Sequence, residues 1–444
     1  MKKIFIKTYG CTLNRSDSDL IEGMLVGKGY LQANSEEEAD AVIVNTCAVK
    51  ETTENKILWH LKELERKGKP TIVAGCLPPV SINAVKRAIP SALGILGPNS
   101  IGRIPELLED KFSQSSKNNG DGRLAIIGPP TSTPEALIDL KSDFSTKFPL
   151  TKLYGSVIAR IQTSSGCLSN CTFCATKIAR GGFKSKPPSL ILNEARMAIK
   201  NHAKEIQLAS QDNGCYGFDL RTDMPELLVQ LSDLEGRFRI RVGMANPQHF
   251  LKSLDEWVEA FRLAKVYKFL HLPFQSGSEK VLLDMRRGHT VEDAVFVVQE
   301  FKRKIPSLTL ATDMIVGFPG ETPEEFGQSL EICRKLKFDV VNFAKYSKRR
   351  GTKAAKMRQF HSRILKERAE IMNKVVKEIA LEQNLQYVGA TYPDVLITEK
   401  ARNGYFQGRN INYKAVLLKG DGLEVGQFAD VKIAGASVTS LIAG

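Results

Sequence analysis

The sequence has no apolar segment of about 20 residues, the length that a membrane-spanning helix needs. Its first residues, Met1–Lys7, also lack the long apolar stretch and small-residue cleavage site of a secretory signal. We therefore expect a soluble, cytoplasmic protein with no membrane partner. Cysteine is sparse, with eight residues among 444. In a reducing compartment, thiols of this kind are expected to bind metals or act in catalysis rather than form disulfides.

Acidic residues are outnumbered by basic ones, 49 against 63, which gives a formal net charge of +14. This excess favours a polyanionic partner, because lysine and arginine neutralise phosphates and release their counterions. The same excess also keeps proteins soluble, and composition alone leaves both explanations open. With 42% hydrophobic and 25% charged residues, the composition excludes a disordered chain and predicts several packed domains.

The first part of the chain alternates strand-like and helix-like segments. Short apolar runs occur at Lys3–Tyr9, Ala41–Asn45 and Thr71–Ala74, and mixed polar and apolar stretches follow at Ser16–Gly29 and Val49–Lys67. This alternation predicts a parallel sheet covered by helices, within an α/β fold class. A stretch rich in Ser, Asn and Gly follows and has the composition of a linker.

A second alternating region predicts a partial (β/α)6 barrel. Its expected strands are Ser156–Thr163, Glu205–Ala209, Arg237–Val242, Lys268–Leu272, Thr309–Ile315 and Val340–Ala344. A long charged helix and a glycine-punctuated tail follow, and the tail predicts a small β-barrel. The predicted domains are an N-terminal sheet domain (1–112), a linker (113–150), the central barrel domain (151–378) and the C-terminal barrel (379–444).

Three cysteines, Cys167, Cys171 and Cys174, form a CxxxCxxC pattern just after a predicted strand. Three thiolates on one loop can hold three irons of a [4Fe–4S] cluster, which normally takes four protein sulfurs. The remaining iron can then bind S-adenosylmethionine (SAM) through its amino and carboxylate groups. A structural zinc site is the alternative, although such sites usually draw four ligands from paired motifs.

Three other cysteines, Cys11, Cys47 and Cys76, each follow a predicted strand of the first domain. Because the carboxyl ends of parallel strands meet at one edge of a sheet, we expect these thiols to converge. A second three-thiolate [4Fe–4S] cluster with one open iron is the predicted result. Taken singly, each cysteine is more often a small buried residue, and we interpret Cys215 and Cys333 in that way.

Several segments carry a resemblance to the methylthiotransferase family of radical SAM enzymes, and they cover nearly the whole chain. These segments are Tyr9–Cys11, Asn45–Val49, Ala74–Pro78, the CxxxCxxC loop with Arg180-Gly181, His271–Ser278 and Thr312–Thr322. The tail resembles the TRAM module that binds RNA. The resemblance implies an auxiliary [4Fe–4S] cluster on Cys11, Cys47 and Cys76, and a radical SAM [4Fe–4S] cluster on Cys167, Cys171 and Cys174. No catalytic residue is assigned beyond these ligands.

The resemblance also implies a reaction. Carbon 2 of adenine has no acidic proton and no leaving group, so acid–base catalysis alone cannot modify it, whereas a carbon radical can. In this family one SAM methylates sulfur at the auxiliary cluster and another generates the radical. Expected partners are the anticodon stem-loop of tRNA, a reducing electron donor such as ferredoxin or flavodoxin, and a sulfur source.

Contacts to SAM are expected at the carboxyl ends of the barrel strands. The candidate cofactor-binding residues are Gln211, Asp212, Arg241, Val316 and Gly317. Gly317 would let the backbone approach the adenine. The Gly-Gly-Glu-like motif usual on the second strand is replaced here by Ala209-Ser210-Gln211-Asp212, and polar surface loops remain the alternative for these positions.

Basic and aromatic residues alternate in the tail, as single-stranded RNA binding requires. They are Lys400, Arg402, Tyr405, Phe406, Arg409, Tyr413 and Lys414. A small packed barrel also needs aromatic residues, so the rings alone do not decide the question.

The substrate is predicted from residues that look closest to the archaeal and eukaryotic branch of the family. They are Leu168, Lys177, Ala179-Arg180 and Val242–Pro247. This branch implies N6-threonylcarbamoyladenosine at position 37 of tRNA. Isopentenyl-adenosine in tRNA is the first alternative. An RNA-binding protein that uses metals only for folding is the alternative from another class.

Overall fold

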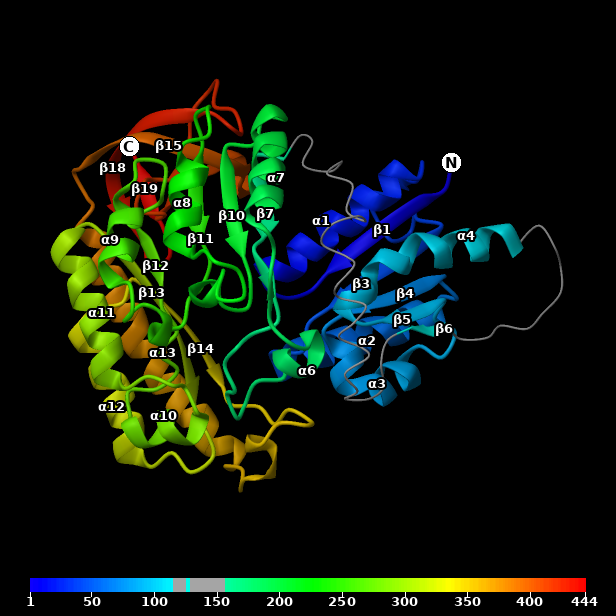
Figure 1. Cartoon of the computed structure of the whole chain (residues 1–444), viewed down its shortest axis with the longest axis horizontal. Helices are drawn as coiled ribbons and strands as arrows, with labels where there is room; N and C mark the ends of the chain where they lie inside the picture. The colour runs from blue at the N-terminus through cyan, green and yellow to red at the C-terminus, as the bar shows by residue number, and fades with distance from the viewer. Residues whose placement is uncertain (115–124, 128–155) are drawn as a thin grey trace.

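The computed structural model describes residues 1–114, 125–127 and 156–444. Three bodies follow one another along the chain: an N-terminal α/β sheet, a central partial barrel and a small C-terminal barrel (Figure 1). The predicted fold class is therefore confirmed. No helix in the described part of the chain has the length and apolar character to span a membrane.

The N-terminal body is a parallel sheet in the order β2-β1-β3-β4-β5-β6. Its strands are β1 (Lys3–Thr8), β2 (Leu31–Gln32), β3 (Ala41–Thr46), β4 (Thr71–Gly75), β5 (Gly94–Leu96) and β6 (Ala125–Ile127). Its helices are α1 (Thr12–Gly27), α2 (Glu51–Arg66), α3 (Leu77–Ala88), the 3-10 helix η1 (Pro98–Arg103) and α4 (Ile104–Gln114).

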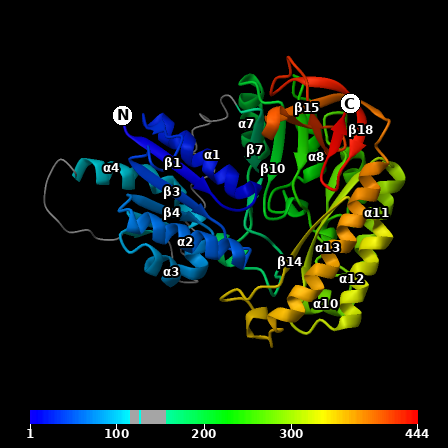
Figure 2. The ribbon, with the colours of Figure 1, turned by 180° about the vertical axis from the view of Figure 1, so that it is seen from behind.

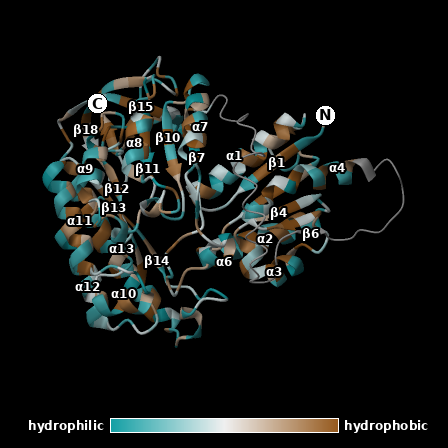
Figure 3. Cartoon of the chain, viewed as in Figure 1, coloured by the Kyte–Doolittle hydropathy of each residue, from teal (hydrophilic) through white to brown (hydrophobic). Residues whose placement is uncertain are grey.

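Both faces of this sheet are buried, which explains why its strands are continuous apolar runs rather than alternating ones. Val42 and Val44 of β3 pack with α2 and α3, whereas Ile43 between them packs with α1 and α4. Figure 3 shows hydrophobic residues along these strands. Strand β6 lies within the predicted linker and pairs with β5, so the sheet extends past residue 112. The other linker residues from 115 onward lie outside the described residues.

The central body contains six parallel strands in chain order. They are β7 (Ile158–Gln162), β10 (Glu205–Ala209), β11 (Arg239–Val242), β12 (Phe269–His271), β13 (Thr309–Val316) and β14 (Val340–Lys345). Backbone bonds from Tyr267 to Ile240 and from Ala245 to His271 join the two halves. No pairing between β7 and β14 occurs among the described strands, so the barrel is open, as predicted.

Helices cover the outside of this barrel and enclose its main apolar core (Figures 1 and 2). They are α7 (Pro188–Lys200), α8 (Met224–Ser232), α9 (Leu254–Arg262), α10 (Glu279–Met285), α11 (Val291–Lys304), α12 (Pro323–Leu336) and α13 (Ser362–Leu385). The short elements are β8 (Ser164–Ser165), α6 (Thr176–Arg180), β9 (Lys184–Ser185), and the 3-10 helices η5 (Asn213–Cys215), η6 (Pro247–His249) and η7 (Ala354–Lys356).

The C-terminal body is a closed barrel in the order β15-β16-β17-β19-β18. Its elements are β15 (Thr391–Lys400), the 3-10 helix η8 (Arg402–Gly404), β16 (Phe406–Arg409), β17 (Ala415–Leu418), β18 (Phe428–Ala436) and β19 (Leu441–Ala443). It lies at the amino ends of the central strands, where the Lys268 N–H donates to the Ile411 carbonyl (Figure 1). The small β-barrel predicted from the tail is confirmed.

The N-terminal body contacts the central barrel through α1 and α6. Arg160 of β7 pairs with Asp19 of α1 at 3.2 Å, and the Ser16 hydroxyl donates to the Arg160 carbonyl at 3.0 Å. Ala179 of α6 packs into the apolar core beneath α2 and α3. The two bodies therefore share a buried interface beside the carboxyl edge of the first sheet.

Candidate functional site

The structure brings Cys11, Cys47 and Cys76 together at the carboxyl edge of the first sheet. They follow β1, β3 and β4, which are neighbours in the sheet. The thiols of Cys11 and Cys76 lie 3.8 and 3.7 Å from the same atom, Asn14 Oδ1. The Cys47 thiol lies close enough to interact electrostatically with both Cys11 and Cys76. Three thiols from three strand ends therefore lie near one another, as the ligands of one iron–sulfur cluster must.

Glycines make this convergence possible. Gly10 has φ +115°, and a Cβ there would lie 2.9 Å from the Cys47 Cβ. Gly75 has φ +98°, and a Cβ there would lie 2.4 Å from Asn45 Oδ1 and 2.5 Å from the Thr46 carbonyl oxygen. Other residues rarely adopt this φ, and no side chain fits these gaps. The glycines that precede two of the cysteines thus let the loops approach each other.

Burial sets the protonation of these thiols when no metal is bound. Desolvation raises the pKa of Cys47, and it raises the pKa of Cys76 to about 12. Both groups are therefore protonated at neutral pH in the metal-free protein. Thiolates become favourable here only when a cation such as iron binds and displaces the protons.

A guanidinium from the central body lies beside these thiols. Arg180, at the end of α6, is 2% exposed and donates to Asp17 and, at 3.2 Å, to Asn14 Oδ1. The positive charge of Arg180 favours the ionised form of both Cys47 and Cys76. From the sequence, Arg180 is visible only as part of a motif, because its partners lie more than 160 residues away.

A second arginine from the central body points to the same place. Arg349 is 5% exposed and pairs with Glu54 of α2, and its charge also favours the thiolate of Cys47. Arg349 belongs to a run of basic residues, 345–356, but it is a buried interface residue rather than part of an exposed charged surface. The auxiliary site is therefore assembled from two bodies of the fold.

The other three cysteines lie on one loop between β8 and α6, at the carboxyl end of the barrel strands. Gly166 begins this loop with φ +75°, and a Cβ there would lie 2.0 Å from the Gly182 carbonyl oxygen. Asn246 and Gln248 both donate to the Ser169 hydroxyl, at 3.3 and 3.0 Å. The Thr172 N–H donates to the Met285 carbonyl at 2.9 Å. The loop is thus fixed to the ends of several strands.

The thiols on this loop have an arginine of their own. Arg287 donates to the Cys171 sulfur at 3.3 Å and to the Pro273 carbonyl at 2.9 Å. Burial raises the pKa of Cys171, and burial together with the charge of Asp212 raises the pKa of Cys167 to about 12. As at the first site, a bound cation is what makes the thiolates stable.

Buried polar atoms near this loop have no partner in the described part of the chain. They are Gln211 Oε1, Asn246 Oδ1 and Arg287 Nε. Unpaired polar groups are costly in a protein interior. The two amide oxygens can accept hydrogen bonds from an amino group, and the guanidinium can donate to a carboxylate. SAM carries both of these groups.

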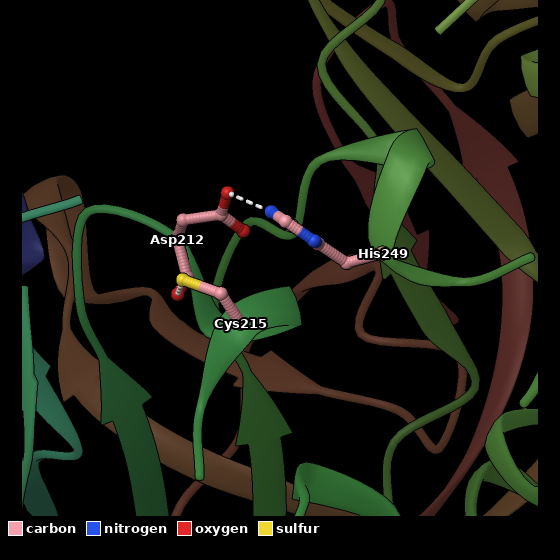
Figure 4. Close-up of side chains that lie close together, drawn as sticks. All are labelled: Asp212, Cys215 and His249. Carbon is pink, nitrogen blue, oxygen red and sulfur yellow. Dashed lines mark hydrogen bonds and ion pairs between the residues drawn. The ribbon is translucent and has the colours of Figure 1, made fainter. Parts of the chain in front are cut away.

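Asp212 lies in the same region and is strongly held (Figure 4). Its Oδ1 accepts the N–H groups of Gly214 and Asn246, each at 3.0 Å, and its Oδ2 lies 3.3 Å from His249 Nε2. The Cys215 thiol donates to the Asp212 carbonyl at 3.3 Å. The ligand atoms of Asp212, Cys215 and His249 lie within 4.8 Å of one another. Because the Asp212 carboxylate already has three partners, hydrogen bonds explain why these three side chains lie together. No bound metal ion is needed to explain their proximity.

Val316 and Gly317 have clear structural roles. The Val316 side chain is buried in the apolar core outside the barrel. Gly317 has φ +73°, and a Cβ there would lie 2.1 Å from Leu365 Cδ2 of α13. Packing of α13 therefore favours glycine here, and the expected contact of Gly317 with the adenine of SAM stays a prediction.

Arg241 lies apart from the other predicted SAM contacts. Its guanidinium carbon lies 5.4 Å from the Phe269 ring centre and 5.5 Å from that of Tyr413, which belongs to the C-terminal barrel. Arg241 thus faces the amino-terminal half of the central barrel, whereas Gln211 and Asp212 lie at its carboxyl end.

Two tail residues expected to contact RNA are turned to the central barrel instead. Lys414 is buried and pairs with Asp339 at 2.6 Å, and the Tyr413 hydroxyl bonds to Glu205 and Gln207. In the sequence, Tyr413 and Lys414 have the alternation of basic and aromatic residues that RNA contacts show. The sequence does not reveal that their loop faces the central barrel. Lys400 and Tyr405 are exposed and stay candidates for RNA binding.

Comparison with known proteins agrees with this architecture. The Radical SAM superfamily matches residues 161–333, the TRAM domain matches 385–443, and an uncharacterized protein family, UPF0004, matches 3–97. A radical SAM methyltransferase, TsrM, from Kitasatospora setae shares the fold with TM-score 0.55 at 14% identity, covering 80% of this chain and 75% of that one. The fold and these matches define the class: a radical SAM protein with a TRAM domain.

Relatives identify the family within this class. The "probable threonylcarbamoyladenosine tRNA methylthiotransferase" of Archaeoglobus fulgidus is 40% identical over 432 residues, 97% of this chain and 96% of that one. The protein so described from Pyrococcus abyssi is 40% identical over 442 residues, 100% of this chain and 99% of that one. The Drosophila melanogaster enzyme is 34% identical over 99% of this chain and 77% of its own. The chain belongs to the threonylcarbamoyladenosine tRNA methylthiotransferase family.

Proposed function

We propose that this protein adds a methylthio group to carbon 2 of N6-threonylcarbamoyladenosine at position 37 of tRNA, giving 2-methylthio-N6-threonylcarbamoyladenosine. The observation that carries the proposal is the pair of three-cysteine sites, one at the carboxyl edge of the first sheet and one at the carboxyl end of the barrel. The α6 segment joins them, because it follows Cys174 and ends at Arg180 beside the first site.

We further propose that each site holds one [4Fe–4S] cluster with an iron left open to an external ligand. The two remaining cysteines do not supply a fourth sulfur: Cys215 bonds to the Asp212 carbonyl, and Cys333 is buried in the core outside the barrel. When bound, the clusters would supply one-electron reduction of SAM at one site and a place for transferable sulfur at the other.

The residues around the sites have separate tasks under this proposal. Arg287 places a positive charge against Cys171, and Arg180 and Arg349 do the same for the N-terminal site. Gln211 and Asn246 offer buried acceptors to the amino group of SAM.

The TRAM match supports tRNA as the macromolecular substrate, and the exposed basic residues of the tail provide charge for its phosphates. An electron donor such as ferredoxin or flavodoxin and a sulfur source remain parts of the proposal, as does a cytoplasmic location. The relatives favour threonylcarbamoyl-adenosine over isopentenyl-adenosine as substrate, because their names specify the former.

Cysteine substitutions test the two sites separately. Anoxic purification of the full chain should yield about eight irons with matching sulfide, and Cys171→Ala and Cys47→Ala should each lose about four. Cys171→Ala should abolish SAM cleavage, whereas Cys47→Ala should retain cleavage and form no methylthiolated nucleoside. Cys333→Ala is the matched control and should retain both activities. Two bound zinc ions, or cleavage unaffected by Cys171→Ala, would contradict the proposal.

The substrate is tested by mass spectrometry of nucleosides from tRNA of a host that expresses the active protein or its Cys171→Ala variant. The expected product is 2-methylthio-N6-threonylcarbamoyladenosine, present only with the active form. A methylthio group on isopentenyl-adenosine instead would assign the protein to a different substrate.

A further inference from the structure

A cavity of about 500 Å³ lies between the central barrel, α13 and the C-terminal barrel. Its polar lining includes Arg241, His271, Asn342, Lys377 and Arg409. This cavity is separate from both cysteine sites, and none of the roles described above uses it.

The cavity opens onto the inner face of the barrel. On β11, Ile240 and Val242 are buried in the core beneath the outer helices, so Arg241 between them points inward. Its partner in register on β10 is Gln207, whose side chain bonds to the Tyr413 hydroxyl inside the barrel. The part of the cavity around Arg241 is therefore the amino-terminal part of the barrel lumen, with Tyr413 in its floor, and the rest lies between α13 and the C-terminal barrel.

The lining carries an excess of positive charge. Lys414 and Asp339 neutralise each other at 2.6 Å. Arg241, Lys377 and Arg409 remain, and no ion pair joins any of these three to a carboxylate among the described residues. Two carboxylates lie behind the lining and are already bonded to it, Glu205 to Tyr413 and Asp313 to His271 and Asn342. The cations without a carboxylate partner are therefore the groups that can attract an anion to the cavity.

Arg241 is the cation best placed to bind such an anion. Its Nε is buried and has no hydrogen-bond partner in the described part of the chain. The rings of Phe269 and Tyr413 lie against its guanidinium at 5.4 and 5.5 Å and fix its plane. A planar guanidinium held in this way is suited to a carboxylate, which it can bind with two parallel hydrogen bonds.

The chain itself limits the distance between Arg241 and the cysteine loop. Arg241 precedes Asn246 by five residues, and Asn246 bonds to Ser169 of the loop. At about 3.3 Å per extended residue, the two points are at most roughly 17 Å apart. The arm on N6 of the adenine leaves the ring from carbon 6, on the other side of N1 from carbon 2. With carbon 2 facing the cysteine sites, the arm can extend into the lumen.

We infer that Arg241 binds the carboxylate of the threonylcarbamoyl arm and thereby selects this modified adenosine. A threonine attached through its amine keeps a free carboxylate, whereas an isopentenyl arm has none. The inference rests on the proposed function, and it gives Arg241 a contact with the substrate in place of the SAM contact expected from the sequence.

Binding of short anticodon stem-loop RNAs to the anoxic, cluster-loaded protein tests this role. Two RNAs are compared by fluorescence anisotropy, one with threonylcarbamoyladenosine and one with adenosine at position 37. The wild-type protein should prefer the first, and Arg241→Met should reduce its affinity on the order of 10- to 100-fold. Affinity for the unmodified RNA should not change. Arg241→Lys should restore part of the preference, because it keeps the charge without the planar fork.

Lys377→Met is the matched control, because it removes an exposed cation from the same cavity. It should leave the preference intact. Iron content and SAM affinity of Arg241→Met, the latter measured by calorimetry, should equal those of the wild type.

Three outcomes overturn the inference. An unchanged preference in Arg241→Met excludes the carboxylate contact. An equal loss for both RNAs assigns Arg241 to a backbone phosphate, and a loss of SAM affinity assigns it to the cofactor. A wild-type protein without any preference contradicts the proposed substrate itself, which separates failure of the proposed function from failure of the role of Arg241.

Discussion

Arg180 and Asp17 form an ion pair whose side chains are only 2% and 3% exposed, although 163 residues separate them in the sequence. The pair joins α6 of the central body to α1 of the first. Asn14, which also accepts a hydrogen bond from Arg180, contacts the thiols of Cys11 and Cys76. One buried cation therefore holds the domain interface and borders the auxiliary site.

Removing this cation should destabilise the protein strongly. Arg180→Met leaves the Asp17 carboxylate buried without its partner, a change that typically costs about 3–5 kcal/mol. Denaturant unfolding of the variant should show this loss, and iron analysis should show reduced loading of the auxiliary site. Arg262→Met, at an exposed pair with Glu259, should change neither quantity. Wild-type stability of Arg180→Met would mean that the pair is not formed.

Glycine substitutions separate the cysteine loop from the general fold. Gly166→Ala places a methyl group 2.0 Å from the Gly182 carbonyl oxygen at φ +75°, so the loop must move and iron loading at Cys171 should fall. Gly327→Ala lies in α12 with open space around it, and it should raise the free energy of unfolding by about 0.5–1 kcal/mol. Iron analysis and denaturant unfolding of both variants test these two expectations. Equal iron content in both variants would contradict the strain at Gly166.

His289 should make the fold sensitive to acid. Burial, followed by the charge of Arg287, lowers the pKa of His289 from 6.5 to about 3, and neither ring nitrogen has a partner among the described residues. Because the folded pKa is the lower one, the unfolded chain binds the proton first, and stability is lost as the pH falls below about 6.5. Between pH 7 and pH 5 this loss amounts to about 2 kcal/mol.

His289→Gln removes this proton-binding group. The difference in free energy of unfolding between pH 7 and pH 5 should therefore be about 2 kcal/mol smaller in the variant than in the wild type. The two differences are obtained by denaturant titration in matched buffers. If both proteins lose the same stability over this range, His289 is not held in its neutral form by burial.

Two lysines of the tail should behave differently. Lys414→Met leaves Asp339 buried and unpaired, so it should destabilise the fold by about 3–5 kcal/mol. Lys400→Met removes an exposed charge, so it should spare stability, weaken RNA binding and reduce the salt slope by about 1. Thermal unfolding and RNA affinity at several salt concentrations distinguish the two. The reverse pattern would place Lys414 on the RNA.

Much of the fold could be predicted because its strands carry strong local patterns. Strand β10 has the predicted bounds, Glu205–Ala209, and β1 and β3 differ from their predicted bounds by one residue. Strands β5 and β19 were missed, because three residues are too few to establish a period.

The convergence of the cysteines followed from topology, because parallel strands end at one edge. Their charged neighbours did not follow, since Arg180 and Arg349 reach the auxiliary site only after two separate bodies pack together. The role of Tyr413 could not be predicted for the same reason. Its place among basic and aromatic residues is typical of an RNA contact, but its hydroxyl bonds to residues inside the central barrel.

The Tyr413 hydroxyl, bonded to Glu205 and Gln207, fixes the C-terminal barrel to the floor of the central one. Neither barrel can rotate against the other without taking that hydroxyl away from both partners. These two hydrogen bonds therefore constrain the spacing between the C-terminal barrel and the cysteine loops at the other end of the central strands.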